Sequence, residues 1–473
     1  MKPLRLHPDR ALPAEPGVRE IARRLYAETG PLPLVCLHGH MDSAVLAEDE
    51  PFSDPAQLLV VPDHYVTRML VSQGVSLDAL GVPRLDGVPV ETGPREIWRL
   101  FCAHWSLFRG TPSRYWIEHE LVEVLGIEIT PSAESADQLY DLIAERLAAP
   151  EFRPRALLDT FRIELLATTD PATADLAHHA TLHKDGLTQV IPTFRPDALV
   201  HLGRADWPAL LTQLAEVSGE DTGTYAGYLT ALARRREAFA AAGALASDHG
   251  HLTAQTAPLE PAAAERIFST ALRGPVDPAA ETAFAGHMLH QMARMSCDDG
   301  LVMQLHPGVL RDHDPAMLAV NGPDRGFDIP VGTEFTRALR PLLESFGRDP
   351  RFRVILFTTD ETAYSRELAP LAGVYPAVRL GAPWWFLDSP DGMRRFRELV
   401  TETAGFANTS GFVDDTRAFL SIPARHDLAR RIDAGYLARL VAEHRLDQDE
   451  AIETAVDLAY HLPKTAYAAR PPG

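Results

Sequence analysis

The amino-acid sequence predicts an α/β fold, a (β/α)8 (TIM) barrel with a helical insertion after its first strand. Short apolar runs alternate with longer stretches of helical periodicity along most of the chain, a pattern typical of parallel βαβ units. We count eight such runs, the number of strands that closes this barrel. The length of 473 residues also suits a barrel enzyme that carries an insertion.

The first strand is predicted at residues 32–37. Before it, Val18 and Leu25 lie at helical spacing and Gly30 supplies a helix stop. The apolar run Leu-Pro-Leu-Val-Cys-Leu then ends at His38, as a buried strand would. The other seven strands are expected at 162–167, 188–193, 242–246, 301–305, 354–357, 377–380 and 408–413. The fourth and eighth of the eight are weak by composition.

Residues 45–155, between the first two strands, are rich in helix signals and aromatic side chains. Asp63 is a candidate N-cap for a helix that carries Tyr65. Aromatic residues follow at spacings of three and four, as on a buried helical face: Trp98, Phe101, Trp105 and Phe108. We expect an N-terminal helix and the first strand in 1–44, a helical insertion in 45–155, and the rest of the barrel with C-terminal helices in 156–473.

The composition argues against several classes of protein. The net charge of −20 argues against a nucleic-acid partner, which requires clustered Lys and Arg. No run of eighteen apolar residues is present, and the first residues lack the apolar stretch of a secretory signal, so we expect no membrane association. The three cysteines match no zinc or disulfide spacing, which predicts reduced thiols in a cytoplasmic protein.

Polar residues follow five of the predicted strands at the points where the strands end. These segments are His38–His40, Thr193–Asp197, Asp248–His251, Gln304–His306 and Asp414–Arg417. Because the active sites of barrel enzymes lie at the C-terminal ends of the strands, we expect these groups to converge at one mouth. An anionic substrate would be held there by a few arginines inside a pocket, despite the acidic surface.

His38 and His40 are candidate metal ligands. Residues i and i+2 of a strand point to the same face, so both imidazoles can reach one ion. The alternative is chance, because the chain holds 19 histidines and short motifs recur by accident. His249 and His251 have the same spacing at another strand end. We interpret them as pocket-lining or supporting residues, since Asp248 and His249 can form a hydrogen-bonded pair.

Asp415 is the natural carboxylate ligand from the last strand, and Arg417 offers a rigid fork for a substrate carboxylate. The alternative for these residues is a solvated turn with a helix cap. His64 and Tyr65 lie at a predicted helix start, where the helix dipole would lower the pKa of the phenol and allow Tyr65 to exchange a proton. From the pattern alone, a core aromatic is the favoured interpretation of Tyr65, as it is of Trp384.

Taken together, these segments resemble the uronate isomerases (glucuronate/galacturonate isomerases) of the amidohydrolase superfamily. The matches run in order along nearly the whole chain: Leu37-His38-Gly39-His40, Pro62-Asp63-His64-Tyr65-Val66, Pro192-Thr193-Phe194-Arg195-Pro196-Asp197, Ser247-Asp248-His249-Gly250, Met303-Gln304-Leu305-His306, Trp384-Trp385-Phe386 and Asp415-Thr416-Arg417. So many ordered matches are highly specific. The resemblance implies a barrel of the metal-dependent amidohydrolase type.

The resemblance also implies the roles of individual residues. The implied metal ligands are His38, His40 and Asp415, which bind a divalent cation, usually Zn2+, in the family. The implied residues at the substrate are His64, Tyr65, Arg195, Trp384, Arg417 and His306. Of these, Tyr65 is expected to handle a proton. His306 is expected near the metal, and whether it also ligates the ion stays open.

The chain departs from the longer family members after the sixth strand. Those members carry an Asn-Pro-Arg-Asp-like segment where this chain has Thr358–Thr362, and the loop before Trp384 is shorter here. A substrate-contacting arginine of those members is then missing, with Tyr364 or Arg366 as candidate substitutes. We therefore expect a divergent branch of the family, which affects substrate preference more than reaction type.

The implied reaction is a reversible aldose–ketose isomerisation, D-glucuronate to D-fructuronate or D-galacturonate to D-tagaturonate. A base removes the C2 proton to give an enediol, and the proton returns at C1. Asp415 is the first candidate for the base, Tyr65 for proton exchange with oxygen, and Arg195 and Arg417 for the carboxylate. We expect a small-molecule hexuronate as the partner, and a homo-oligomer.

Two other functions stay open. A mononuclear metal-dependent hydrolase shares the barrel and the His-x-His motif. Hydrolytic members more often carry a bridging lysine on the fourth strand, where this chain has Ser247-Asp248-His249. A sugar-acid-binding protein without catalysis explains less well why His64, Tyr65 and Asp415 occur together.

Overall fold

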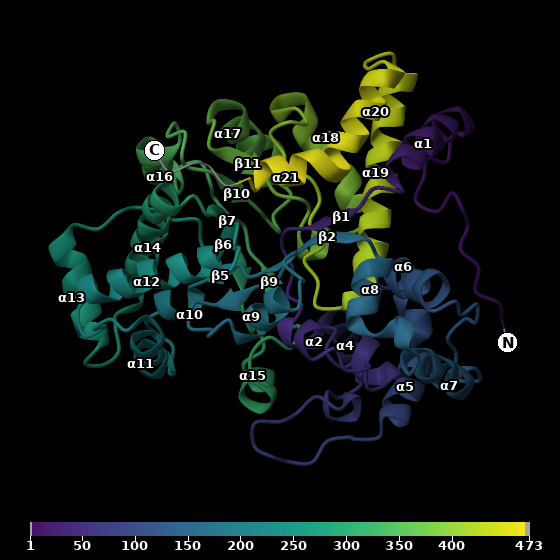
Figure 1. Cartoon of the computed structure of the whole chain (residues 1–473), viewed down its shortest axis with the longest axis horizontal. Helices are drawn as coiled ribbons and strands as arrows, with labels where there is room; N and C mark the ends of the chain where they lie inside the picture. The colour runs from purple at the N-terminus through teal and green to yellow at the C-terminus, as the bar shows by residue number, and fades with distance from the viewer. Residues whose placement is uncertain (1, 469–473) are drawn as a thin grey trace.

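The computed structural model describes residues 2–468. Parallel strands lie near the centre of the molecule, with helices around them (Figure 1). The strands pair in two runs, β1-β2-β4 and β3-β5-β6-β7-β10-β11. Their bounds are β1 (Leu34–Cys36), β2 (Ile163–Ala167), β3 (Asp170–Pro171), β4 (Val190–Ile191), β5 (Phe194–Arg195), β6 (Ala246–His251), β7 (Val302–Pro307), β10 (Val354–Leu356) and β11 (Val378–Leu380).

These strands form the first seven positions of a (β/α)8 barrel. The strand β2 pairs with β4, and β3 pairs with β5, so β2–β3 and β4–β5 are each one barrel position interrupted by a short irregularity. At the eighth position, Thr409 forms a parallel bridge with Leu380 of β11. The amide of Asp415 then donates to the carbonyl oxygen of His38 at 3.1 Å, which links the eighth position back to the first.

The predicted fourth and eighth strands are wrong in their bounds. The fourth begins at Ala246, where the prediction ends it, because residues 242–245 form the turn that follows α12 (Tyr225–Ala241), with Gly243 at a φ of 90°. The eighth keeps only the bridge at Thr409, since Gly411 has a φ of 72° and this left-handed backbone interrupts an extended strand. The other six agree with the structure to within a few residues.

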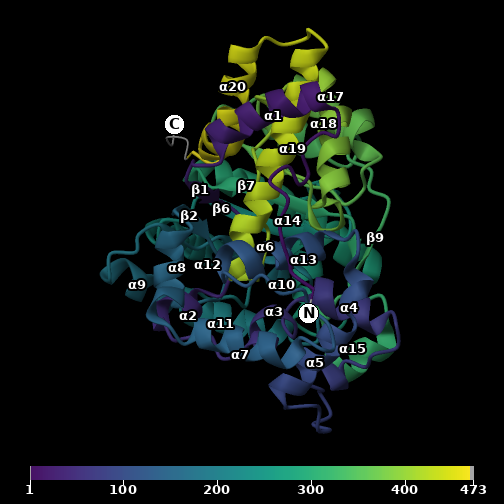
Figure 2. The ribbon, with the colours of Figure 1, turned by 90° about the vertical axis from the view of Figure 1, so that its right-hand side faces the viewer.

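The helices that follow the strands cover the outside of the barrel. They are α9 (Ala177–Lys184), α10 (Asp197–Val200), α11 (Trp207–Ser218), α12, α13 (Pro261–Ala271), α14 (Pro278–Asp299), α16 (Arg340–Phe346), α17 (Ala369–Val374), α18 (Pro390–Ala404) and α19 (Ile422–Ala442). Beyond them, α20 (Gln448–Val456) and α21 (Leu462–Ala466) end the chain, and α1 (Pro16–Thr29) packs along α19 (Figure 2). No helix in residues 2–468 is long and apolar enough to span a bilayer.

Residues 45–155 are helical throughout their regular parts. The helices between β1 and β2 are α2 (Ser43–Glu48), α3 (Pro55–Leu59), α4 (His64–Val71), α5 (Pro94–Ala103), α6 (Pro112–His119), α7 (Ala136–Leu147) and α8 (Pro154–Thr160). Asp63 caps α4 by accepting a hydrogen bond from the amide of Tyr65 at 2.8 Å. The four aromatic residues on α5 and on the following 3-10 turn η2 (Trp105–Phe108) are buried in the core that this region shares with β1 and β2.

A long excursion after β7 overhangs the carboxyl ends of the strands. It consists of an antiparallel hairpin, β8 (Val309–Leu310) with β9 (Ile329–Pro330), and of α15 (Pro315–Asn321) between the two strands. Four charged residues of this excursion face the same space as the strand ends: Arg311, Asp312, Asp324 and Asp328.

Candidate active site

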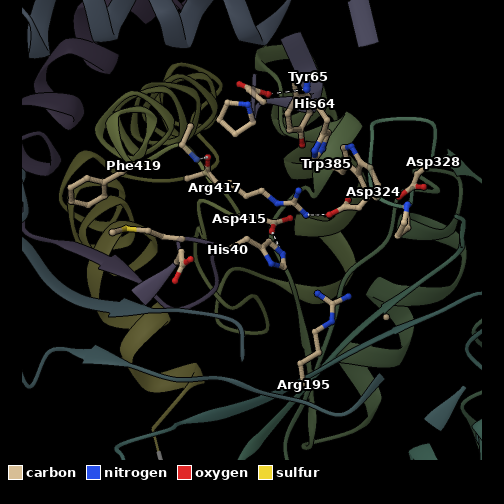
Figure 3. Close-up of a pocket in the computed structure, with 18 of the residues that line it drawn as sticks. His40, His64, Tyr65, Arg195, Asp324, Asp328, Trp385, Asp415, Arg417 and Phe419 are labelled. Carbon is tan, nitrogen blue, oxygen red and sulfur yellow. Dashed lines mark hydrogen bonds and ion pairs between the residues drawn. The ribbon is translucent and has the colours of Figure 1, made fainter. Parts of the chain in front are cut away.

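A cavity of about 690 Å³ lies at the carboxyl ends of the barrel strands. Its walls combine residues that follow the strands with residues of α3, α4 and the excursion after β7. The polar groups lining it include His40, Asp63, His64, Tyr65, Arg195, Asp197, His201, Arg311, Asp324, Asp328, Asp415, Arg417 and Arg425 (Figure 3). Four of the five segments expected to converge reach this cavity, and the segment 304–306 does not line it.

His38, His40 and Asp415 form a cluster that can hold a metal ion. The Nε2 atoms of His38 and His40 lie 3.4 and 3.1 Å from the same oxygen, Oδ1 of Asp415. One ligand atom from each residue lies within 4.8 Å of the other two. The buried Nδ1 of His38 has no hydrogen-bond partner among the described residues. Two imidazoles and one carboxylate are a donor set that divalent zinc-like cations favour, so these residues fit a divalent metal.

The backbone holds Asp415 in an uncommon conformation. Its φ is 42°, in the left-handed region that non-glycine residues rarely adopt. Its amide donates to the carbonyl oxygen of His38, and the amide of His40 donates to the carbonyl oxygen of Thr416 at 2.9 Å. Burial opposes ionisation of Asp415, but hydrogen bonding to His38 and His40 outweighs burial and holds its pKa well below the ordinary range. Asp415 is therefore an anion at neutral pH.

His306 lies behind the metal cluster and is not part of the cavity wall. Its ring stacks on that of His38 with centroids 4.6 Å apart and on Phe357 with centroids 4.1 Å apart. Its Nδ1 lies 2.7 Å from Oδ1 of Asp248, which is also buried. The side chain of His306 is only 4% exposed, so it supports His38 at its back.

Arg195 extends from β5 into the cavity, below His40 and Asp415 in Figure 3. Its Nε donates to Oδ2 of Asp197 at 2.8 Å, and its Nη1 lies 3.4 Å from Oδ2 of Asp248. Burial alone would lower the pKa of the guanidinium, but the charges of Asp197 and Asp248 raise it above its ordinary value. Arg195 is thus a fixed cation whose remaining N–H groups face the cavity.

Arg417 lies on the opposite wall and is half exposed. Its guanidinium donates to Asp324 of the excursion after β7, as the dashed line in Figure 3 shows. This ion pair connects the end of the last barrel position to the excursion. A substrate carboxylate would compete with Asp324 for Arg417.

His64 and Tyr65 begin α4 and stack on each other with ring centroids 5.0 Å apart. The Tyr65 ring also contacts Trp116 edge-on and lies beneath the guanidinium of Arg425. Contrary to the expectation from the helix dipole, burial raises the pKa of Tyr65. Desolvation of the phenolate outweighs the positive end of a short helix, so Tyr65 is a neutral hydrogen-bond donor.

Trp384 lines the cavity and meets His306 edge-on, with ring centroids 4.7 Å apart. Its neighbour Trp385 also lines the cavity, with a left-handed φ of 53°. Both rings belong to a buried core cluster. Trp384 is therefore a core residue, as the sequence pattern favours. One edge of its ring also faces the site, as the resemblance implies.

The candidate substitutes for the missing family arginine are wrong. Tyr364 is buried against Phe396, and Arg366 pairs with Glu367 outside the cavity. Arg311 lines the cavity instead, donating to Asp328 at 2.7 Å with its guanidinium carbon 5.2 Å from the centre of the Trp385 ring. Arg311 reaches the cavity because the excursion after β7 is long enough to overhang the strand ends. No local sequence pattern around Arg311 predicts this position.

Arg425 is a further cavity residue that the sequence analysis misses. It lies on α19, is buried, and donates to Oδ2 of Asp388 at 2.6 Å. Its guanidinium carbon lies 3.7 Å from the centre of the Trp116 ring. In the sequence Arg425 is one of several arginines in a predicted helix, and nothing distinguishes it from the others. The packing of α19 against the barrel brings it to the site.

Comparison with known proteins gives one family. The model of the glucuronate isomerase family matches residues 17–467. A uronate isomerase of Rhizorhabdus wittichii is 57% identical over 98% of this chain and 99% of its own length. One of Xanthomonas campestris pv. campestris is 55% identical, with the same coverage of both chains.

Solved structures agree with this result. The crystal structure of a glucuronate isomerase from Caulobacter crescentus superposes with a TM-score of 0.97 at 53% identity, covering 99% of this chain and 98% of that one. The uronate isomerase of Thermotoga maritima gives 0.91 at 29% identity, covering 98% and 100%. A protein assigned as a metal-dependent hydrolase from Lactobacillus casei gives 0.52 at 14% identity, which concerns the fold alone and does not favour the hydrolase alternative. With relatives at 55–57% identity over almost their entire length, the chain belongs to the glucuronate isomerase family.

Proposed function

We propose that this chain is a uronate isomerase that interconverts D-glucuronate and D-fructuronate, or D-galacturonate and D-tagaturonate, in the cavity at the carboxyl ends of the strands. The class of reaction follows from the family. The roles of individual residues are our proposal. It depends on one observation: an ionised carboxylate, a neutral phenol and several arginines face one cavity of about 690 Å³.

The substrate carboxylate would bind between Arg195 and Arg417, which lie on opposite walls of the cavity. Both carry forked N–H donors suited to a carboxylate. Trp384 would place its exposed edge against the carbon chain. His64, whose pKa burial lowers, would be a neutral hydrogen-bonding group beside the sugar.

Asp415 would act as the base. It accepts the proton from C2 of the aldose, and the electron pair left at C2 forms the enediol while O1 is protonated. Tyr65, as a neutral donor, would supply the proton to O1 and recover one from O2, which becomes the ketone oxygen. Asp415, once its proton has exchanged with solvent, would then protonate C1. The reaction also needs a hydrogen-bonding group at the oxygens where negative charge develops, and the Tyr65 hydroxyl is the candidate for it.

We propose Zn2+ as the ion held by His38, His40 and Asp415. The two nitrogens and one oxygen are a usual zinc donor set. When bound, the ion supplies positive charge to the hydroxyl–carbonyl pair of the substrate. We also propose that the enzyme works in the cytoplasm as a homo-oligomer, and the three buried free cysteines suit a reducing compartment.

Proton exchange tests this function directly. Purified enzyme is incubated with each hexuronate in deuterated water, and the products are followed by NMR. The enediol route predicts ketose formation with solvent deuterium at C1. A lack of turnover of either hexuronate would refute the proposed function. Turnover without deuterium at C1 would support the isomerase function. It would refute the exchange with solvent of the proton held by the base.

A further inference from the structure

A second cluster of potential metal ligands lies beside the cavity, apart from the His38–His40–Asp415 cluster. It consists of Asp197 at the start of α10 and of His249 and His251 on β6. One ligand atom from each residue lies within 4.8 Å of the other two. Both imidazoles are more than 90% buried.

Each of the three side chains has one buried polar atom with no partner among the described residues. These atoms are Oδ1 of Asp197, Nδ1 of His249 and Nε2 of His251. A buried polar atom without a hydrogen-bond partner is unfavourable, so three of them in one place require a common explanation. A cation between them would satisfy all three at once.

In Asp197 and His249 the other polar atom of the side chain is already hydrogen-bonded, which leaves the unpaired atom available to an ion. Oδ2 of Asp197 accepts from Nε of Arg195 at 2.8 Å and from the amide of Gly250 at 2.9 Å. Nε2 of His249 lies 3.0 Å from the hydroxyl of Ser247. Gly250 permits this arrangement, because a Cβ atom there would lie 3.1 Å from Oδ2 of Asp197 and 3.0 Å from Arg195.

The electrostatics of the cluster suit a divalent cation. Arg195 lies beside the two carboxylates of Asp197 and Asp248, and the other guanidiniums near the cluster, Arg236 and Arg311, are paired with Asp299 and Asp328.

An ion can reach the cluster from the cavity. Asp197 and His201 both line the cavity wall. The ring of His201 lies 5.0 Å from that of His251, centroid to centroid, so His201 or a water from the cavity is available as a fourth ligand.

We propose that Asp197, His249 and His251 form a second site for a divalent transition-metal ion, of the class that zinc represents. In this site Asp197 would bridge, with Oδ1 on the ion and Oδ2 on Arg195. The ion would thereby hold Arg195 in the orientation that points into the cavity. It acts through Arg195 and does not touch the substrate, so it is a positioning element of the active site.

Metal stoichiometry tests this site without reference to turnover. Metal-stripped protein is titrated with Co2+, and binding is followed by the visible absorption of the ion and by elemental analysis after gel filtration. The wild type should bind two equivalents. His249→Gln and Asp197→Asn should each bind one, and His40→Asn should also bind one, with the spectrum of the other site. His178→Gln, an exposed histidine on α9, should keep both equivalents.

The results distinguish this proposal from the proposed function on which its positioning role rests. A wild-type stoichiometry of one that His40→Asn abolishes would overturn the second site, whatever the activity. Two equivalents that survive in both His249→Gln and Asp197→Asn would overturn it too. If the site exists, Asp197→Asn should raise KM for the hexuronate about tenfold with a smaller change in kcat. A wild-type KM in Asp197→Asn would refute the proposal that the ion positions Arg195. The metal stoichiometry would still decide whether the second site exists.

Discussion

The ring of His306 stacks on the ring of His38, with centroids 4.6 Å apart, and thereby fixes one candidate metal ligand from behind. Asp248 in turn lies 2.7 Å from Nδ1 of His306. Supports of this kind orient a ligand without touching the ion, and their loss typically lowers metal affinity 10- to 100-fold.

We therefore predict that His306→Gln weakens metal binding by about tenfold while KM changes little. A competition titration against a chromophoric chelator measures the affinity. The control is His290→Gln, an exposed-side histidine of α14 that hydrogen-bonds Ser345 far from the cavity. A large rise in KM with unchanged metal affinity would instead make His306 a substrate-binding residue.

Asp415→Asn should reduce kcat by about 10²- to 10⁴-fold, the usual contribution of a general base. Substrate binding should be affected less, because Arg195 and Arg417 remain. Steady-state kinetics together with the binding of a non-reacting uronate analogue separate the two effects. Activity within tenfold of the wild type would assign the base elsewhere.

Arg417→Met should raise KM by about 10- to 100-fold, since a charge-assisted hydrogen bond contributes about 1.5–3 kcal/mol. Asp324→Asn provides the matched comparison. It removes the ion-pair partner of Arg417 and should keep KM near the wild-type value or lower it. If KM were unchanged in Arg417→Met, the carboxylate would bind at a different arginine.

Glu120 should make stability depend on pH. Burial raises its pKa to about 8 in the folded protein, against about 4.3 in the unfolded chain. Between these values the folded state holds the extra proton, so the contribution present at low pH is lost as pH rises through 8, by up to about 1.4 kcal/mol per pH unit. Glu120→Gln should remove this dependence and unfold at a higher temperature than the wild type at pH 8. Melting curves at pH 5.5 and pH 8 check it, and parallel pH profiles would contradict it.

Much of the fold is predictable because the barrel strands are apolar and the helices are punctuated by proline and glycine. The fourth strand is the instructive failure. Its residues Ser247, Asp248, His249 and His251 are poor strand formers, and they occupy β6 because its neighbours on both sides hold it in place. The polar residues that make this strand hard to predict are the same residues that supply its hydrogen-bonding groups and candidate metal ligands.

The candidate site is predictable to the extent that its residues follow strands. His38, His40, Arg195, Asp415 and Arg417 all do so, and all but the buried His38 line the cavity. Arg311 and Arg425 come from a long excursion and from a helix, where position depends on tertiary packing. The protonation state of Tyr65 also depends on burial of its hydroxyl, and the sequence at the start of a helix does not predict that burial.

The two backbone hydrogen bonds between residues 38–40 and residues 415–416 join the first part of the barrel to the last. Contacts between such distant parts of a chain carry a large loop-closure entropy and form late in folding. A chain truncated before Thr409 would contain both histidines but neither the carboxylate nor the backbone that positions it. Tight metal binding should consequently serve as a reporter of complete synthesis and ring closure, rising only when the final barrel position has docked.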